Sequence, residues 1–313
     1  MANRKSPIPQ SLVKRVIRQL LLPVVSHRLE VVDFGNNRFL EAAMVFLKKV
    51  ATAKAKNETI DADWYKDVFL DKSLPKNEIA TNAGINMKTI GNSYGSGKMS
   101  TVIDASNISY ESIKRLVGSL IEKNSDTDMT IVINTPGGSA ELDINESFIV
   151  ISALAAKHAA LGGGLWSSIG KQGEKPLVHV LCNLYSVAPE NYNLSVEDGS
   201  AGKNKREVDF FLVKGNTRYQ GEVKIVGRGN PENMDGPIAR RSHIVIADSL
   251  SERNIRDLES EGIKWVKLEE DHGHHRFAKA LKEFGIPHEP YKEDWQENID
   301  EMINRAFDEC GSY

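Results

Sequence analysis

The chain has 313 residues, of which 40% are hydrophobic and 27% charged, and its formal net charge is −3. These values fit a globular protein of one large or two smaller domains that buries its core without crosslinks. Two cysteines, Cys182 and Cys310, are too few for a disulfide framework. No run approaches the roughly 18 apolar residues that a membrane span needs. We therefore expect a cytoplasmic protein that does not enter membranes.

The first hundred residues are predicted to form a mainly helical region. Residues 11–55 carry apolar side chains at three- to four-residue spacing with basic residues between them, a helical pattern that Pro23 and Gly35 are expected to break. Residues 56–100 are polar and turn-rich, as in a linker or a mobile loop. A boundary near residue 100 gives a helical N-terminal region at 1–100 and a second domain at 101–313.

The second domain is predicted to combine helices and strands. Ser109 is placed to cap its first helix, and Ser251 caps a later helix that Gly262 closes. From residue 170 on, the pattern predicts an α/β fold, a three-layer core in which helices flank a mixed sheet. The expected elements are helices at 109–124 and 141–161, a helix from about Lys171, strands at 129–134, 208–213, 219–227, 242–250 and 264–270, and helices at 251–262, 275–285 and 291–313.

Three charged residues occupy a predicted pair of strands, where a half-buried sheet is least expected to hold them. Glu222 and Lys224 point to one face because side chains alternate along a strand, and a turn around Gly215 brings Asp209 level with them. Two neighbouring carboxylates raise each other's pKa unless a cation lies between them. Mg²⁺ prefers one or two carboxylates, waters and a phosphate oxygen, so the group predicts metal-assisted phosphodiester hydrolysis. The alternative is an exposed salt-bridge cluster, in which each pair contributes about 0–1 kcal/mol.

The spacing Asp209…Glu222-Val223-Lys224 resembles the D…(D/E)xK signature of the PD-(D/E)XK nuclease superfamily. Val208 occupies the position at which proline is usual, but residues other than proline also occur at this position in the superfamily. The resemblance implies that Asp209 and Glu222 bind Mg²⁺, that the Val223 carbonyl is a further ligand, and that Lys224 is the catalytic lysine.

The flanking sequences at 166–187 and 221–271 are similar to type II restriction endonucleases, in particular to those that cut palindromes with CC and GG ends such as CCWWGG. This resemblance covers roughly residues 130–313. Several members also carry a glutamate on the helix before the sheet, a role that Glu174 fills here. A solvent-exposed glutamate favoured by the helix dipole is the alternative. Some restriction enzymes use a distal glutamate in place of the one in the E-x-K motif, and Glu232 is the candidate for that role here. Because Glu222 is present in the motif, such a replacement is unnecessary.

A sequence-specific nuclease must hold phosphates and read base edges. The net charge is only weak evidence against a DNA partner, because the distribution of charge matters more than its sum. Glycine-rich segments on both sides of the strand pair let the backbone approach a ligand, and arginine and asparagine match guanine and adenine edges. The candidate DNA-binding residues, each of which is alternatively a solvated surface residue, are Arg228, Asn230, Arg240, Arg241, Ser168 and Lys171.

A palindromic site in double-stranded DNA implies a two-fold homodimer in which each subunit cuts one strand. The basic side chains of the N-terminal helices fit dimer or DNA-backbone contacts, and solvated amphipathic helices explain them equally well. The resemblance therefore implies a Mg²⁺-dependent type II restriction endonuclease that leaves 5′-phosphate and 3′-hydroxyl ends.

Other functions fit parts of the sequence. A DNA-repair or mobile-element nuclease shares the fold, and so does a non-catalytic DNA-binding module, which the intact catalytic residues argue against. Residues 133–141 resemble a turn of ClpP-like serine peptidases, but the serine elbow of those enzymes is missing. Gly91–Ser100 lacks the spacing of a phosphate loop. His272, His274 and His275 suggest zinc, but without cysteine or histidine partners at fixed spacing a polar loop is favoured.

Overall fold

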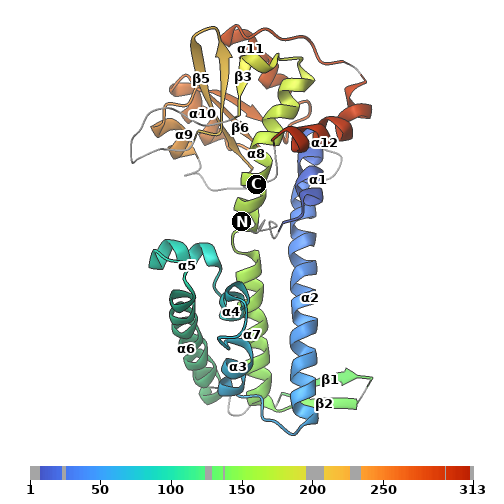
Figure 1. Ribbon diagram of the computed structural model, residues 1–313, viewed down its shortest axis with the longest axis vertical. Coiled ribbons are helices and arrows are strands. Elements are labelled where there is room, and N and C mark those ends of the chain that lie inside the picture. The colour runs from blue at the N-terminus through green and yellow to red at the C-terminus, as the bar shows by residue number, and fades with distance from the viewer. Residues whose placement is uncertain are drawn as a thin grey trace. The chain divides into compact units, whose positions relative to one another are not determined.

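The computed structural model describes residues 8–22, 26–123, 129–136, 138–194, 208–225, 234–292 and 294–310. The chain forms two compact units, each with its own set of elements (Figure 1). Unit 1 consists of Met1–Val32 and Trp166–Tyr313, and unit 2 of Asp33–Leu165. Residue 100 lies inside unit 2, and the division of function between residues 1–100 and 101–313 stays a prediction.

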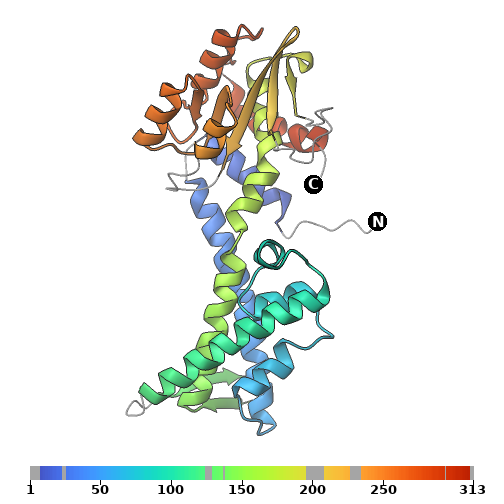
Figure 2. The same cartoon turned by 90° about the vertical axis from the view of Figure 1, so that its left-hand side faces the viewer.

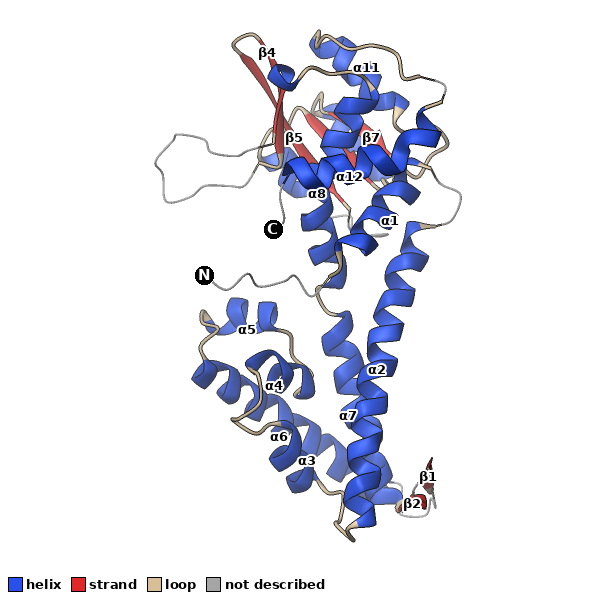
Figure 3. Cartoon of the chain, turned by 45° about the vertical axis from the view of Figure 1, so that its right-hand side comes forward, coloured by secondary structure: helices blue, strands red, loops and turns tan. Residues whose placement is uncertain are grey.

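Unit 1 is built on a mixed sheet, as the sequence predicted (Figure 3). The strand order is β3-β4-β5-β6-β7, with antiparallel pairs from β3 to β5 and parallel pairs from β5 to β7. The interior strand β6 is buried along its whole length, as expected for a strand covered on both faces. The strands are β3 (Tyr192–Asn193), β4 (Phe210–Lys214), β5 (Thr217–Lys224), β6 (Ile244–Ala247) and β7 (Lys264–Lys267).

Helices cover both faces of this sheet. Helix α9 lies in the connection from β5 to β6, and α10 in the connection from β6 to β7. Both connections are expected to be right-handed and run the same way across the sheet, so α9 and α10 lie on the same face. Figure 2 shows α8, in yellow-green, on the opposite face. The helices of unit 1 are α1 (Gln10–Leu21), α8 (Leu165–Leu184), α9 (Asp235–Ala239), α10 (Glu252–Ser260), α11 (His275–Phe284) and α12 (Ile299–Cys310), with 3₁₀ turns at Pro189–Asn191 and Trp295–Asn298.

Local sequence explains several of these boundaries. Ser251 and Asn254 form a capping box at the start of α10, and Gly262 after the helix adopts a left-handed φ of 70°. The apolar face of α1, which includes Leu12, Val16 and Leu20, is buried. The mixed sheet with helices on both faces confirms the predicted three-layer α/β core.

Gly221 faces the fully buried ring of Phe210 on the neighbouring strand. A Cβ atom at residue 221 would overlap this ring, so only glycine lets β4 and β5 pair in this register. We expect Gly221→Ala to lower the free energy of unfolding by about 1–3 kcal/mol, because the ring must leave its position. Urea unfolding followed by circular dichroism measures this loss. An unchanged midpoint would contradict the packing described for Gly221.

Unit 2 is mainly helical. It contains most of α2 (His27–Ala55), together with α3 (Ala62–Phe69), α4 (Lys76–Asn82), α5 (Met87–Tyr94), α6 (Met99–Lys123), α7 (Ile144–Gly162) and an antiparallel hairpin of β1 (Ile131–Thr135) and β2 (Gly138–Leu142). Its core joins buried residues from α2 to α7, among them Phe46, Tyr65, Ile79, Val102 and Val150.

Three expectations for this region are wrong. Residues 56–100 are not a linker, because α3, α4 and α5 supply Tyr65, Ile79 and Ile90 to the core. Gly35 does not interrupt α2, since an isolated glycine costs a helix only about 1 kcal/mol. Ser109 is not a helix cap: it lies within α6 and its hydroxyl donates to the carbonyl of Ala83 over 2.6 Å.

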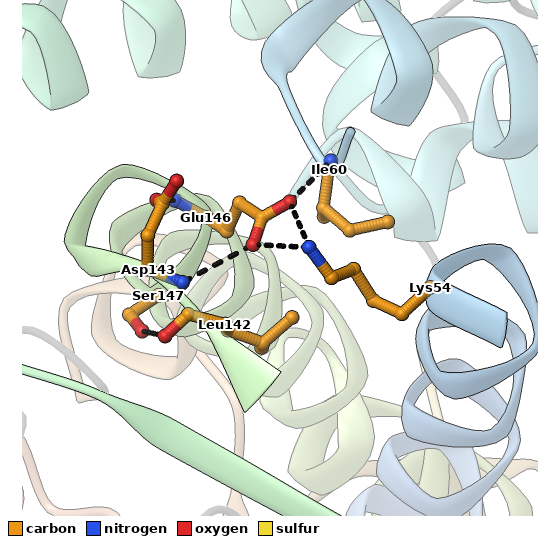
Figure 4. Close-up of polar contacts among 6 residues, drawn as sticks. All are labelled: Lys54, Ile60, Leu142, Asp143, Glu146 and Ser147. Atoms are coloured by element: carbon orange, nitrogen blue, oxygen red, sulfur yellow. Dashed lines mark hydrogen bonds and ion pairs between the residues drawn. The ribbon is translucent and has the colours of Figure 1, made fainter. Parts of the chain in front are cut away.

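A buried carboxylate joins three segments of unit 2 (Figure 4). Glu146 is 3% exposed, and both its oxygens lie 2.9 Å from Lys54 Nζ on α2. It also accepts from the backbone N–H of Ile60 and completes a capping box with Asp143. Burial works against the negative charge, but these donors outweigh it, and they lower the pKa of Glu146.

We expect Glu146→Ala to destabilise unit 2 by about 2–4 kcal/mol, because two backbone donors lose their acceptor and Lys54 its partner. Since the folded-state pKa is lowered, the contribution is present above the ordinary glutamate pKa of 4.5 and is lost as the pH falls. Thermal unfolding at pH 7 measures the loss, with Glu141→Ala on the exposed β2 position as the control. Equal melting temperatures for the two variants would contradict this role.

One stretch, Ile144–Leu184, is long and apolar enough to cross a membrane by length and composition, with a mean hydropathy of 1.5 in its most apolar window. This corrects the expectation that no run approaches that composition. A single stretch of this kind is weak evidence for a membrane span, because core helices pass the same test. Its first part, α7, packs against α4 and α6 within unit 2.

Candidate active site

The hairpin of β4 and β5 brings Asp209 to Glu222 and Val223, as the sequence predicted. Phe210 pairs with Gly221, so Asp209 stands just beyond the last paired residue of β4. There its Oδ2 accepts the backbone N–H of Val223 over 2.8 Å. The carbonyl of a strand residue points to the same side as its N–H, so the Val223 carbonyl also faces Asp209.

Glu222 is fully buried, and three side chains surround its carboxylate. Arg240 Nη1 lies 2.5 Å from Oε2, and Lys224 Nζ lies 3.1 Å from the same oxygen. The Ser242 hydroxyl donates to Oε1 over 2.9 Å. Because a buried charge is costly unless it is paired, these three partners explain how a carboxylate is kept inside the sheet.

A short turn delivers two of these partners. The five-residue helix α9 ends at Ala239, and the N–H of Ser242 then donates to the carbonyl of Pro237. Arg241 between them has a left-handed φ of 55° and an exposed side chain, which directs Arg240 and Ser242 toward Glu222. A non-glycine residue in this conformation costs about 1–2 kcal/mol, so the surrounding structure must fix the turn.

The carboxyl edge of the sheet carries a second buried carboxylate that the sequence analysis missed. Asp248 follows β6 directly, and its N–H donates to the Lys224 carbonyl over 3.1 Å. Its side chain is fully buried, with His27 Nε2 at 3.3 Å and Arg28 Nη2 at 3.7 Å. The available signal was its place after a buried parallel strand, where sites in α/β sheets gather. Asp248 positions the end of β5 from which Lys224 projects.

Helix α8 passes the end of β5. A Cβ atom at Gly170 would stand 2.8 Å from the carbonyl oxygen of Ile225, so the helix and the strand end touch here. Glu174 lies one turn further on the same helix face and is partly buried. Ser168 and Lys171 are exposed on the first turns of α8. The structure thus keeps Glu174 on the side of α8 that meets the strand end.

The predicted DNA-binding residues have different surroundings. Arg228 and Asn230 lie outside the described residues, as does Glu232. Arg240 is partly buried and contacts the Glu222 carboxylate, whereas Arg241 is exposed to solvent. The sequence pattern did not indicate that Arg240 would contact the proposed metal ligand.

Three basic residues of α1 are engaged within unit 1. Lys14 donates to Asn304 over 2.7 Å, Arg15 pairs with Glu30, and Arg18 pairs with Asp300. Contacts within the chain therefore explain some of the basic residues that were considered for dimer or DNA-backbone contacts.

The donor set suits a divalent cation. Burial raises the pKa of Asp209 despite the Val223 N–H and the nearby Lys224, so its charge lacks full compensation. No donor among the described residues contacts its other oxygen, Oδ1. Asp209 interacts electrostatically with Glu222 and accepts from the Val223 N–H, so two carboxylates and a carbonyl lie in one region. Hard oxygen ligands of this kind are those that Mg²⁺ prefers.

The segment that resembled a peptidase turn, residues 133–141, forms the β1–β2 hairpin of unit 2. His179, the histidine that follows it, is bonded to Glu309 at 2.8 Å and to Asn183 at 2.9 Å, and not to a serine. This arrangement offers no serine–histidine pair for peptide hydrolysis.

A model of the CfrBI restriction endonuclease family matches residues 10–255, more than half of the 313-residue chain. The chain belongs to the CfrBI restriction endonuclease family. The match confirms the resemblance to type II restriction endonucleases, and it includes the whole cluster around Glu222. Members of this class act on DNA and generally use divalent metal ions. No curated protein and no solved structure matches the chain.

Proposed function

We propose that this restriction endonuclease is a Mg²⁺-dependent type II enzyme that hydrolyses phosphodiester bonds of double-stranded DNA at a short palindromic site. The observation that carries the proposal is the convergence of Asp209, Glu222 and Lys224 at the end of β5, in a chain of a restriction endonuclease family. The products are 5′-phosphate and 3′-hydroxyl ends.

Asp209, Glu222 and the Val223 carbonyl would hold the metal ion. When bound, Mg²⁺ supplies a Lewis acid for a water nucleophile and neutralises charge on the phosphate. Lys224 is 23% exposed at its side chain, so its ammonium reaches both the carboxylate and solvent. It orients the attacking water and stabilises the negative charge that develops on the phosphate. Glu174 on α8 is the fourth proposed catalytic residue.

Arg240 and Ser242 fix the Glu222 carboxylate before substrate arrives. Arg240 and Lys224 contact the same oxygen of Glu222, and a metal ion held by this carboxylate would supply positive charge that reduces the need for both. We propose that Arg240 then contacts a DNA phosphate, because its planar guanidinium is suited to bind phosphate oxygens. Arg228, Asn230, Arg241, Ser168 and Lys171 stay proposed DNA contacts.

The two-fold symmetry of a palindrome leads us to propose a homodimer that works in the cytoplasm, each protomer cutting one strand. A site with CC and GG ends, such as CCWWGG, is the proposed class of recognition sequence, because of the sequence resemblance at 166–187 and 221–271. A repair or mobile-element nuclease with this fold is the second candidate, favoured only by the same catalytic residues.

The test is digestion of several unmodified plasmids by the purified protein with Mg²⁺ and with EDTA. Discrete fragments with Mg²⁺ alone are expected, and sequencing of their ends gives the recognition site and the end chemistry. A featureless smear would favour the repair or mobile-element nuclease. Absence of cleavage of every DNA would overturn the restriction function.

A further inference from the structure

Three histidines gather at the start of α11, on the loop that follows β7. Their potential ligand atoms all lie within 4.8 Å of one another. The rings of His272 and His275 stack with centroids 4.9 Å apart, and the His274 ring stands edge-on to His275 at 4.6 Å. His274 is 2% exposed, whereas the other two are exposed. The cluster therefore has one buried and two accessible imidazoles.

The backbone of this loop is tightly fixed. His272 has a left-handed φ of 53°, which a side-chain-bearing residue rarely adopts. At Gly273 a Cβ atom would overlap the carbonyl of Lys267, so this position requires glycine. A backbone conformation of this kind costs of order 1–3 kcal/mol. Strained residues of this kind cluster at active sites and ligand-binding sites.

A second layer of contacts orients the buried ring. The Tyr185 hydroxyl donates to the His274 carbonyl oxygen over 3.2 Å and lies 2.8 Å from His274 Nδ1. In the tautomer of His274 that carries its proton on Nδ1, this nitrogen donates to the Tyr185 hydroxyl oxygen. His274 Nε2 then keeps its lone pair. Metal-bound histidines are typically held in this way through their other nitrogen.

Burial and the neighbouring histidines lower the pKa of His274 to about 4, and they lower the pKa of His275 as well. Neutral imidazole is the form of histidine that binds metal ions.

We propose that His272, His274 and His275 bind one divalent transition-metal ion of the Zn²⁺ class, with water in the remaining position. Tetrahedral zinc with ligands at 2.0–2.1 Å needs nitrogens about 3.3 Å apart, so binding requires side-chain rotations that unstack the rings of His272 and His275 and bring the three nitrogens together. Three imidazoles select zinc, nickel or copper over Mg²⁺, which prefers oxygen. The loop lies two strands away from β5 in the sheet order, and the site is separate from Asp209 and Glu222.

The test is titration of the full-length, untagged, chelator-treated protein with Co²⁺ in excess Mg²⁺, which keeps the oxygen-ligand site occupied. We expect one Co²⁺ per chain with the visible absorption of a tetrahedral complex, displaced by Zn²⁺. Tyr185→Phe should weaken binding by about 10–100-fold, as loss of an outer-shell partner typically does. His272→Ala and His275→Ala, both at exposed positions, should abolish the absorption band.

Two controls separate this site from others. His158→Ala removes an exposed histidine of α7 in unit 2, and Asp209→Asn removes a proposed magnesium ligand. Both should bind Co²⁺ as the wild type does. Circular dichroism shows whether each variant is folded. Absence of stoichiometric binding to the wild type, or wild-type affinity in a folded His272→Ala or His275→Ala variant, would overturn the proposal.

Discussion

Replacing Lys224 with alanine is expected to slow DNA cleavage by about 10²–10³-fold, the typical effect of removing one group that stabilises transition-state charge. The Lys224 ammonium is held 3.1 Å from Glu222, at the point where the proposed metal ligands converge. Arg240 and Ser242 still hold Glu222 in the variant, so the fold and the carboxylate position are retained. DNA binding should change far less than the rate.

Single-turnover cleavage of one plasmid site gives the rate, and gel shift in Ca²⁺ gives the affinity. Lys214→Ala is the matched control, because it removes an exposed lysine from the far end of the same hairpin. We expect the control to cut as the wild type does. Equal rates for Lys224→Ala and Lys214→Ala would exclude Lys224 from catalysis.

Asp209→Asn should abolish cleavage and at the same time stabilise the metal-free protein. Burial raises the pKa of Asp209 above its ordinary value of 3.8. The folded protein therefore binds this proton more tightly than the unfolded chain. The stability due to Asp209 is present below pH 3.8 and is lost as the pH rises through the folded-state pKa. At pH 7 the ionised group is a net penalty, which asparagine removes while its amide oxygen still accepts the Val223 N–H.

Melting temperature measured in EDTA at pH 7 tests this prediction, and it should rise by a few degrees. The difference should shrink toward pH 4 and reverse with Mg²⁺, since the ion binds only the wild-type carboxylate. Asp67→Asn, at an exposed position of α3, should leave the melting temperature unchanged. A lower melting temperature for Asp209→Asn in EDTA would show that the carboxylate is already compensated.

The sequence was sufficient to predict the hairpin and its register. An apolar run identifies β4, and alternating apolar and polar residues identify β5. The turn at Gly215 fixes which residues of the two strands face one another, so Asp209 and Glu222 could be placed together. Local periodicity carries this information. The capping residue Ser251 and the closing Gly262 were equally readable, because each acts within one turn of its own helix.

The partners of Glu222 could not be predicted in the same way. Arg240 and Ser242 reach it only because α9 is short and Arg241 adopts a left-handed conformation, which no residue type between them demands. For this reason the sequence predicted Arg240 as a DNA contact and not as a partner of Glu222. The convergence of the three histidines depends in the same way on the backbone at His272 and Gly273.

The error at residues 56–100 has a different physical cause. Short helices such as α3, α4 and α5 bury only a few apolar residues each, so most of their sequence is polar. Their stability comes from packing in the core of unit 2 and not from length, which local patterns do not report.

The rate of cleavage at one plasmid site as a function of Mg²⁺ concentration, for the wild type and for Glu222→Gln, tests the proposed metal site most directly. With a metal ion at this site we expect saturable dependence on Mg²⁺ for the wild type, no cleavage in EDTA, and a loss of at least about 10²-fold in the variant at every concentration. Cleavage in EDTA, or a Glu222→Gln variant that cuts at the wild-type rate, would contradict this expectation.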